Sequence, residues 1–410
     1  MQDIVIKNAA VVLKDRVLNS ASVWIRGPQI QEISENPDFA ERVSNAKQID
    51  AEGAYLIPGF IDIHSDNIET VIQPRPQSMI DFEIAMREQE KQLVNQGITT
   101  MYHSLSILEI KNPNEQVSFK KGLVRTPENL KRLVGFIRTF HEGDHLIRHR
   151  FHCRYDITNT NGYDMVLDFI RNGDMQLLSF MDHTPGQGQY RDLELFKNHV
   201  LSPEQSDAEK EKILSQKMSR AKLTDEQMTR AADMAVQAGI PIASHDDDSL
   251  EKLDYVTQKL HATICEFPVE LAVAKEAHRR GMQVVVGATN VLMGRSHSNN
   301  LSALEAIQNG CADILVSDYF PAAILHAVFQ LYEQGVLSLP EAVNMATYNP
   351  AKAIGLSERL GSVEPGKYAD LLLVSKKGTV PVILSVFING EEVTKIHYRN
   401  DFAGKDGARL

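Results

Sequence analysis

Five short segments place histidine or a carboxylate directly after an apolar run, and these residue types bind divalent metal ions. The clearest segment is IPGFIDIHSDN, residues 57–67, in which the apolar stretch ends in His64 and Asp66. Alternate residues of a strand share a face, so both side chains can point towards one ion. Imidazole nitrogen and carboxylate oxygen together suit Zn²⁺, Mn²⁺ or Fe²⁺. One such pair is weak support, because a capping aspartate beside a structural histidine has the same sequence.

Four further segments repeat the arrangement, and they carry Asp182-His183, His245-Asp246, Glu266 and Asp318. One shared metal site explains these placements better than independent coincidence does. Asp318 is also the predicted general base, because a carboxylate beside a metal-bound water can accept its proton. The predicted ligands of one or two divalent ions, Zn²⁺ or Mn²⁺, are His64, Asp66, His183, His245, Glu266 and Asp318.

The composition is that of a globular protein, with 43 % apolar and 24 % charged residues. A formal net charge of −11 argues against non-specific binding to nucleic acid or anionic membranes, and an anionic substrate would need a local cluster of cations. Three cysteines are too few for a disulfide framework or a cysteine-based zinc site. Residues 1–7 lack a secretory signal, and no segment reaches the about 18 apolar residues of a membrane span. We expect a soluble cytoplasmic protein; a homo-oligomer stays open.

The elements that must position these residues alternate between strands and helices. From Pro58 to about residue 345, short apolar runs alternate with helical patterns, which indicates βαβ units and a parallel sheet. This favours a (β/α)₈ TIM-type barrel, whose catalytic groups lie at the carboxyl ends of its strands. A doubly wound sheet is the alternative, but no Gly-x-Gly-x-x-Gly follows an early strand. The eight predicted strands end near His64, His103, Asp156, Met181, His245, Glu266, Gly287 and Asp318.

Both ends of the chain are rich in predicted strands. We expect residues 1–56 and 350–410 to form one small composite β-sandwich, and residues 57–349 to form the barrel. A charged helical insertion is predicted around residues 202–237, between the fourth and fifth strands. It either covers the site or is a solvated helical hairpin.

Several motifs resemble the amidohydrolase superfamily. They are Pro-Gly-Phe-x-Asp-x-His at 58–64, the strand-end His245 and Asp318, Asn-Pro-Ala at 349–351 and Gly-Lys-Tyr-Ala-Asp-Leu at 366–371. Longer motifs at 64–67, 74–76, 179–187, 244–247, 295–298 and 317–321 resemble the branch that removes pyrophosphate from a ribose 5-triphosphate in bacterial phosphonate degradation. The resemblance implies a metal-dependent phosphoric anhydride hydrolase in which activated water attacks phosphorus.

The chain departs from the common superfamily pattern at three points. Asp66 stands where many members have a second histidine, no lysine ends the fourth strand, and Glu266 stands where histidine is frequent. These changes make the ligand set richer in oxygen, which favours Mn²⁺ or a similar ion. The number of metal ions, one or two, stays open.

A triphosphate substrate, with roughly four negative charges, needs arginine or lysine at the barrel mouth. Arg75, Arg154 and Arg295 are the predicted phosphate contacts, and Asn67 is a further predicted substrate contact. His297, in a Gly-Arg-Ser-His-Ser loop, is predicted to bind a phosphate or to donate a proton to the leaving group.

Other interpretations remain. The same scaffold could act on a cyclic amide, an N-acyl amino acid or a nucleobase, or it could be a binding protein that has lost its metals. A helical metal site at His141, His145 and His149 is rejected, because the segment from Arg148 has the pattern of a strand. That strand would place His152, Arg154 and Asp156 on one face.

Overall fold

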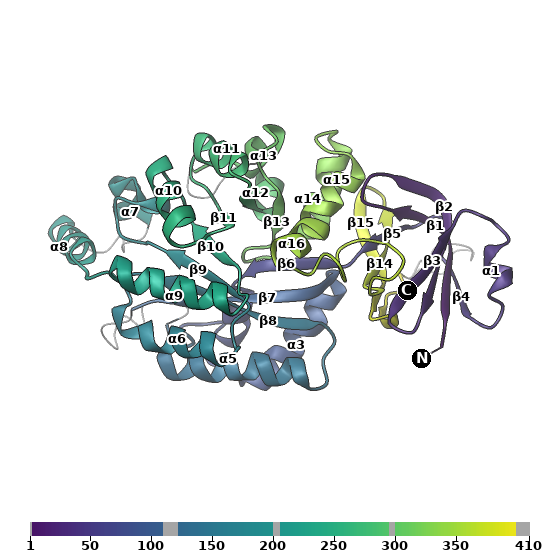
Figure 1. The fold of residues 1–410 in the computed structure, drawn as a ribbon, viewed down its shortest axis with the longest axis horizontal. Coiled ribbons are helices and arrows are strands. Elements are labelled where there is room, and N and C mark those ends of the chain that lie inside the picture. Colours follow the sequence, from purple (N-terminus) through teal and green to yellow (C-terminus); the bar gives the residue numbers. More distant parts are fainter. Residues whose placement is uncertain (1, 110–121, 200–205, 295–299, 399–410) are drawn as a thin grey trace, which may run out of the picture.

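The computed structural model describes residues 2–109, 122–199, 206–294 and 300–398 (Figure 1). Its centre is an eight-stranded parallel sheet in which neighbours along the chain pair in order, and its right-hand end in Figure 1 is a second eight-stranded sheet. The central strands are β6 (Phe60–Ser65), β7 (Ile98–Ile107), β8 (Arg148–Asp156), β9 (Leu177–Met181), β10 (Ile242–His245), β11 (Ile264–Glu266), β12 (Gln283–Gly287) and β13 (Ile314–Val316).

The last central strand returns to the first. A parallel bridge joins Ser65 to Asp318, the Asp318 amide donates to the His64 carbonyl over 3.0 Å, and the Asp66 amide donates to the Asp318 carbonyl over 2.9 Å. The sheet is therefore closed as the predicted TIM-type barrel. Seven strands end within two residues of their predicted ends; β7 continues four residues beyond His103.

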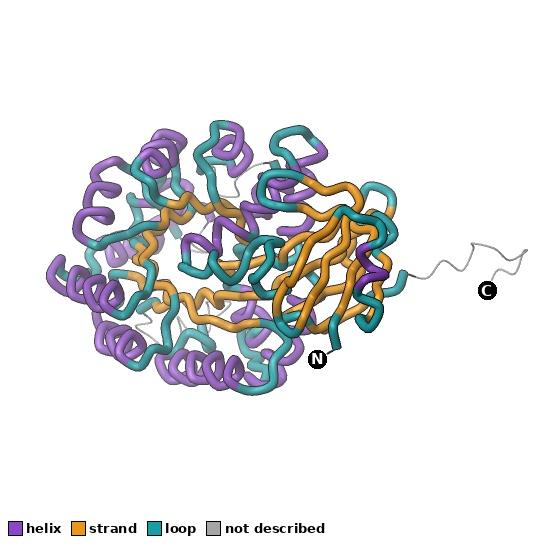
Figure 2. The backbone as a smooth tube through the Cα atoms, turned by 45° about the vertical axis from the view of Figure 1, so that its right-hand side comes forward, coloured by secondary structure: helices purple, strands orange, loops and turns teal. Residues whose placement is uncertain are grey.

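Helices surround the barrel (Figure 2), and their packing follows the predicted apolar periodicity. Thr224 begins α9 with a capping box in which Thr224 and Gln227 exchange side-chain and backbone hydrogen bonds. The described helices of the barrel region are α2 (Asn67–Ile72), α3 (Phe82–Asn95), α5 (Pro127–Glu142), α6 (Tyr163–Arg171), α7 (Leu193–His199), α8 (Asp207–Met218), α9 (Asp225–Gln237), α10 (Leu250–Lys259), α11 (Leu271–Arg279), α12 (Ala288–Met293), α13 (Ala303–Gln308), α14 (Ala323–Glu333), α15 (Leu339–Ala346) and α16 (Tyr348–Ala353).

Helices α7, α8 and α9 lie between β9 and β10, where the sequence predicts an insertion. Helix α9 buries Met228, Ala231, Ala232 and Ala235 and packs on α6 and β10, so it is one of the barrel helices. Helix α8 buries only Leu214 among its own residues and forms a small separate core with α7; it lies at the far left in Figure 1. No described helix combines the length and the apolar character that crossing a membrane requires.

The two ends of the chain meet in one mixed sheet. Its strands are β1 (Ile4–Val12), β2 (Val17–Arg26), β3 (Gln29–Ser34), β4 (Lys47–Asp50), β5 (Tyr55–Pro58), β14 (Leu371–Lys377), β15 (Val380–Ile388) and β16 (Glu391–Lys395), and the short helix α1 (Phe39–Arg42) lies between β3 and β4. They follow the order β16-β15-β14-β5-β1-β2-β3, with β4 paired to β1.

This sheet folds over onto itself around its own apolar core, as the sandwich prediction requires. The Ala369 amide donates to the Pro28 carbonyl over 2.9 Å, which brings the chain before β14 against the turn between β2 and β3. Gly390 lies so close to that turn that a Cβ atom would stand 2.1 Å from the Gly27 carbonyl oxygen, and its φ of 78° also favours glycine. The predicted joining of both termini in one β unit is confirmed.

One buried ion pair connects the barrel to this β unit. Arg148, the first residue of β8, donates to the Asp370 carboxylate and to the Asn389 side chain. The Asn389 amide also donates to Asp370 over 2.9 Å. Arg148 and Asp370 keep 12 % and 4 % of their side chains exposed, so the pair is part of the interface core.

Candidate active site

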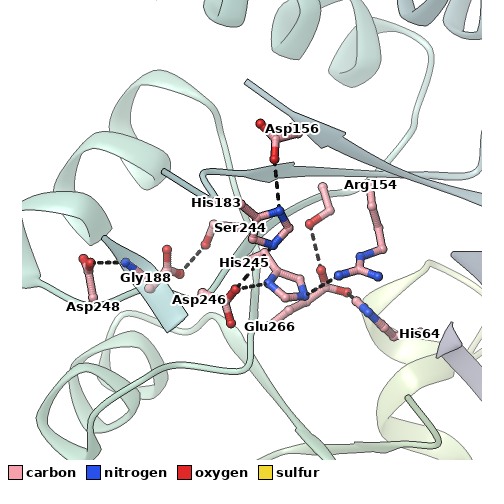
Figure 3. A network of polar contacts seen from close by, with 12 residues as sticks. His64, Arg154, Asp156, His183, Gly188, Ser244, His245, Asp246, Asp248 and Glu266 are labelled. Atoms are coloured by element: carbon pink, nitrogen blue, oxygen red, sulfur yellow. Dashed lines mark hydrogen bonds and ion pairs between the residues drawn. The ribbon is translucent and has the colours of Figure 1, made fainter. Parts of the chain in front are cut away.

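Two groups of side chains with close ligand atoms lie at the carboxyl ends of the barrel strands; Figure 3 shows the second group and part of the first. Among the described residues, the first group is His64, His152 and Glu266, and the second is His183, His245 and Asp246. Within each group the ligand atoms lie within 4.8 Å of one another. The groups adjoin, because the ring centroids of His64 and His245 are 5.3 Å apart.

The first group is fully buried. His64 Nδ1 lies 2.7 Å from Glu266 Oε1, and Ser179 Oγ donates to the other Glu266 oxygen over 2.8 Å. His152 Nδ1 lies 3.0 Å from the Ile63 carbonyl oxygen, which can only accept, so this nitrogen carries the proton. The other nitrogen, Nε2, therefore presents its lone pair 3.8 Å from Glu266 Oε1.

Burial keeps the imidazoles of the first group neutral. It holds the pKa of His64 well below its usual range, with Arg154 and His245 adding to the effect. Burial also lowers the pKa of His152 to about 3. A neutral imidazole is the form that binds a metal ion.

The second group is organised by a carboxylate outside it. His183 Nδ1 donates to Asp156 Oδ2 over 3.0 Å, which leaves Nε2 as the acceptor, 3.9 Å from Asp246 Oδ2. His245 Nδ1 lies 2.9 Å from the same Asp246 oxygen. Burial alone would raise the pKa of Asp246, but His245, His183 and Lys252 lower it to about 2, so the carboxylate is ionised.

Both groups fit a divalent ion. No described residue offers a hydrogen-bond partner to His152 Nε2 or His183 Nε2, although both nitrogens are buried. Buried polar atoms are normally paired, so two lone pairs facing carboxylates are what a bound cation would satisfy. The donor set of neutral imidazoles and carboxylates suits Zn²⁺, Mn²⁺ or a similar ion.

The structure brings together four of the six predicted ligands: His64, His183, His245 and Glu266. Asp66 and Asp318 line the adjoining pocket instead. His64 and Asp66 do not share a strand face as predicted, because β6 ends at Ser65 and Asp66 immediately precedes α2.

Two members of these groups, His152 and Asp246, were not predicted as ligands. His152 belongs to the predicted face of β8, and all three residues of that face reach the site: His152 lies near Glu266, Arg154 Nη2 lies 3.3 Å from His245 Nε2, and Asp156 holds His183. Asp246 directly follows the predicted ligand His245, but its φ of 54° takes it out of strand geometry.

A pocket of about 190 Å³ opens beside the two groups. Three carboxylates line it, from Asp66, Asp246 and Asp318, together with the single described cation Arg154. Asp318 sits at the seam that closes the barrel with a φ of 63°. Non-glycine residues rarely adopt this conformation, and such strain concentrates at functional sites.

The other predicted substrate residues are placed differently. The Asn67 side chain donates to the Tyr319 carbonyl over 3.3 Å and accepts from Gln89 over 3.0 Å, so it links the start of α2 to α3 and to the loop after β13. Arg75 is exposed in the turn between α2 and α3, and it is absent from the described lining of the pocket. Arg295 and His297 lie outside the described residues.

The rejected histidine run is divided between three elements. Helix α5 ends at Glu142, just after His141, His145 follows in a loop, and His149 is buried in β8. His149 pairs with His103 on the adjacent strand, with 2.9 Å between the ring nitrogens. The predicted strand from Arg148 is confirmed.

Comparison with known proteins agrees with this geometry. An amidohydrolase family model matches residues 216–393. The chain is 30 % identical over 395 residues to alpha-D-ribose 1-methylphosphonate 5-triphosphate diphosphatase of Escherichia coli (strain K12). This match covers 95 % of this chain and 100 % of that protein. The chain is 22 % identical over 388 residues to imidazolonepropionase of Thermoplasma acidophilum, covering 88 % and 84 % of the two chains.

Solved structures share the fold. The N-acetylglucosamine-6-phosphate deacetylase of Pasteurella multocida matches with a TM-score of 0.62 at 13 % identity, covering 95 % of this chain and 98 % of that one. The dihydropyrimidinase of Brevibacillus agri NCHU1002 matches with a TM-score of 0.58 at 14 % identity, covering 96 % and 95 %. With a full-length relative and a barrel mouth suited to metal binding, the chain belongs to the amidohydrolase family.

Proposed function

We propose that the protein is a metal-dependent diphosphatase that hydrolyses α-D-ribose 1-methylphosphonate 5-triphosphate to the 5-phosphate and pyrophosphate. One observation carries the proposal: the similarity to the Escherichia coli enzyme of that name extends over 95 % of this chain and all of that protein, at 30 % identity. Four other relatives, imidazolonepropionase among them, are either less similar in sequence or match a shorter part of the chain.

The chemistry of the site is compatible with this reaction. A divalent ion, when bound, lowers the pKa of water and offsets the charge of phosphoryl oxygens. The residues His64, His152, Glu266, His183, His245 and Asp246 would hold one or two such ions. Asp318 lines the pocket as a carboxylate that can accept the proton of the attacking water.

Arg154 is the described residue best placed to bind a phosphate. It lines the pocket, and its guanidinium lies 3.3 Å from the His245 ring, so it can contact a phosphoryl group beside the metal ligands. Asp156 orients His183 and so maintains the second ligand group. We expect Arg295 and His297 to add phosphate contacts from their loop.

The main competing function is hydrolysis of a cyclic amide. It draws support from the weaker similarity to imidazolonepropionase and from a match of 24 % identity over 183 residues to a dihydroorotase of Geobacter metallireducens. A cyclic amide has no triphosphate for Arg154 to bind. A metal-free binding protein is a poorer explanation, because both ligand groups are intact.

Phosphorus NMR tests the proposal. Protein loaded with Mn²⁺ or Zn²⁺ is incubated with ribose 1-methylphosphonate 5-triphosphate, with ATP and with dihydroorotate, and ultraviolet absorbance follows the amide. We expect pyrophosphate from the first substrate and none after chelation. Turnover of dihydroorotate without pyrophosphate release would replace the proposal by the cyclic-amide function. Absence of turnover with every substrate and metal would support the binding protein.

A further inference from the structure

A lysine behind the second ligand group holds the backbone of two of its members. Lys252 lies in the first turn of α10, and its Nζ donates to the carbonyl oxygens of His245 over 2.8 Å and of Asp246 over 3.1 Å. The same Nζ lies 3.3 Å from Asp247 Oδ1, while 23 % of the lysine side chain stays exposed. One ammonium group thus contacts three consecutive residues.

Asp247 connects this lysine to the neighbouring strands. Its carboxylate is fully buried and accepts hydrogen bonds from Ser244 Oγ and from Cys265 Sγ, the latter over 3.2 Å. Its backbone carbonyl accepts from the Val269 amide over 2.9 Å. The Lys252 ammonium therefore lies beside a buried carboxylate that is itself bonded to two strands.

The backbone at this point lacks the support of regular strand geometry. Strand β10 ends at His245, and Asp246 adopts a φ of 54°, which a side chain other than glycine rarely takes. The Asp246 amide is held by the Glu266 carbonyl over 2.9 Å. The carbonyls of His245 and Asp246 instead point to Lys252, which supplies the donor that such buried groups require.

The other side of the turn is closed by the loop after β9. A Cβ atom on Gly188 would lie 3.2 Å from Asp246 Cβ, and the Gly188 amide donates to Asp248 Oδ2 over 2.6 Å (Figure 3). Asp246 is therefore held between a glycine on one side and the Lys252 ammonium on the other.

We propose that Lys252 is a positioning residue for the metal site: its ammonium group fixes the His245 and Asp246 carbonyls, so that both ligand side chains stand in metal-binding geometry before the ion arrives. Preorganised ligands bind more tightly, because ordering them costs nothing when the metal enters. The inference rests on the metal dependence proposed above and is independent of which substrate is cleaved. Lys252 itself acts through the ligands and touches no reacting atom.

A purely stabilising role makes a different prediction. If Lys252 only neutralised the buried Asp247, its removal would destabilise the fold and leave the geometry of the ligands unchanged. The Lys252→Met variant removes the ammonium and keeps most of the aliphatic stem. The double variant Lys252→Met/Asp247→Asn removes both charges, so Asp247 does not remain as a buried carboxylate without its lysine. Lys367→Met is the matched control, because Lys367 is a buried lysine bonded to Ser362 in the β unit.

The test uses full-length protein stripped of metal. Titration calorimetry with Mn²⁺ alone measures affinity, and the visible spectrum of the Co²⁺-loaded protein reports ligand geometry. We expect Mn²⁺ affinity to fall about tenfold to a hundredfold in Lys252→Met and in the double variant, with a changed Co²⁺ spectrum in both. In Lys367→Met the Mn²⁺ affinity and the Co²⁺ spectrum should both be unchanged, even if the variant is less stable.

Two results would overturn the inference alone. One is Mn²⁺ affinity within twofold of the unchanged protein in Lys252→Met; the other is recovery of affinity and spectrum in the double variant, which would assign Lys252 to charge balance. If Lys252→Met does not fold, the double variant alone tests the inference. Mn²⁺ affinity within twofold of the unchanged protein in that variant would overturn it. Absence of Mn²⁺ and Co²⁺ uptake by the unchanged protein would instead remove the proposed metal dependence, and this inference with it.

Discussion

Hydrogen bonds made by Nδ1 determine which ring nitrogen of His183 and of His152 faces the metal site. His183 and His152 both donate through Nδ1, to Asp156 and to the Ile63 carbonyl, and both leave Nε2 towards a carboxylate of their group. A carboxylate partner also makes the imidazole a stronger ligand. Burial would raise the pKa of Asp156, but its bonds to His183 and Thr158 lower it, so Asp156 stays ionised.

Replacing Asp156 by asparagine should weaken metal binding. The amide keeps the size of the side chain but lacks the charge that holds His183, so we expect Mn²⁺ affinity to fall about tenfold to a hundredfold in calorimetry. Asp168→Asn, on the exposed face of α6, is the control and should bind normally. Unchanged affinity in Asp156→Asn would show that the charge of Asp156 does not contribute to metal binding through His183.

Replacing Asp318 by asparagine should abolish most turnover and keep the fold. Loss of a general base costs roughly 10²–10⁴ in rate, and the side chain is partly exposed at the pocket, so little packing is lost. Steady-state kinetics and circular dichroism measure the two effects. Asp15→Asn, at an exposed position in the β unit, should leave kcat unchanged. If Asp318→Asn keeps more than a tenth of the turnover, Asp318 is not the base.

The position of the site could be predicted from the sequence more accurately than the identity of each ligand. His64, His183, His245 and Glu266 could be predicted because each lies at the end of an apolar strand or just beyond it. Asp246 could not be assigned, since its left-handed backbone breaks the alternation on which strand arguments depend. Arg75 sits between prolines near a strand end, but chain proximity did not determine where the turn would direct it.

At the level of elements, strands β7 and β8 carry a second cluster of histidines, on the side that faces α3 and α5. His103 and His149 stack with ring centroids 5.2 Å apart, and His149 Nε2 lies 3.4 Å from Glu90 of α3. Burial holds the pKa of His103 well below its ordinary value of 6.5, and the nearby His149 adds to this. Burial also lowers the pKa of His149 despite Glu90.

These depressed pKa values predict that the protein loses stability below pH 6.5. The folded state keeps His103 neutral, while His103 of the unfolded chain takes up a proton below pH 6.5. The free energy of unfolding is therefore highest above pH 6.5 and decreases as the pH falls below that value. In His103→Asn the decrease between pH 7.5 and 5.5 should be smaller by about 1 kcal/mol. Urea denaturation of metal-free protein at both pH values measures it.

The exposed His261 provides the comparison for this pH dependence. It lies 3.2 Å from Asp233 with about half of its side chain exposed. His261→Asn should therefore have a far smaller effect on the decrease in the free energy of unfolding between the two pH values. An identical decrease in the unchanged protein and in His103→Asn would contradict the assignment.

The strands themselves were predictable from their apolar runs and the polar loops that follow. The exception is β7, which continues through Ser104-Leu105-Ser106-Ile107. All four residues are buried, because Ser104 bonds to His152 and the Ser106 amide donates to Glu69. Serines are typical of loops, but here their polar groups form hydrogen bonds with residues far away in the sequence. The apolar periodicity of the sequence contains no information about these partners.

For the whole molecule, the joint between barrel and β unit depends on Arg148. In Arg148→Met the Asp370 carboxylate would stay buried with its main counter-charge removed, and breaking a buried pair in this way costs about 3 kcal/mol or more. Urea denaturation should show this loss. Arg171→Met removes an exposed pair with Asp168 and should cost under about 0.5 kcal/mol. Equal losses in the two variants would mean that the joint does not depend on Arg148.

The pairing of β5 with β14 also affects how the chain is made. In the finished sheet β5 lies between β1 and β14, and Leu372 pairs with Ile57. Strand β14 leaves the ribosome about 300 residues after β5, which takes roughly 15–60 s at ordinary translation rates. During that time one edge of β5 has no partner, and such edges favour aggregation. A nascent chain of this protein should therefore depend on chaperones until its last strands have been synthesised.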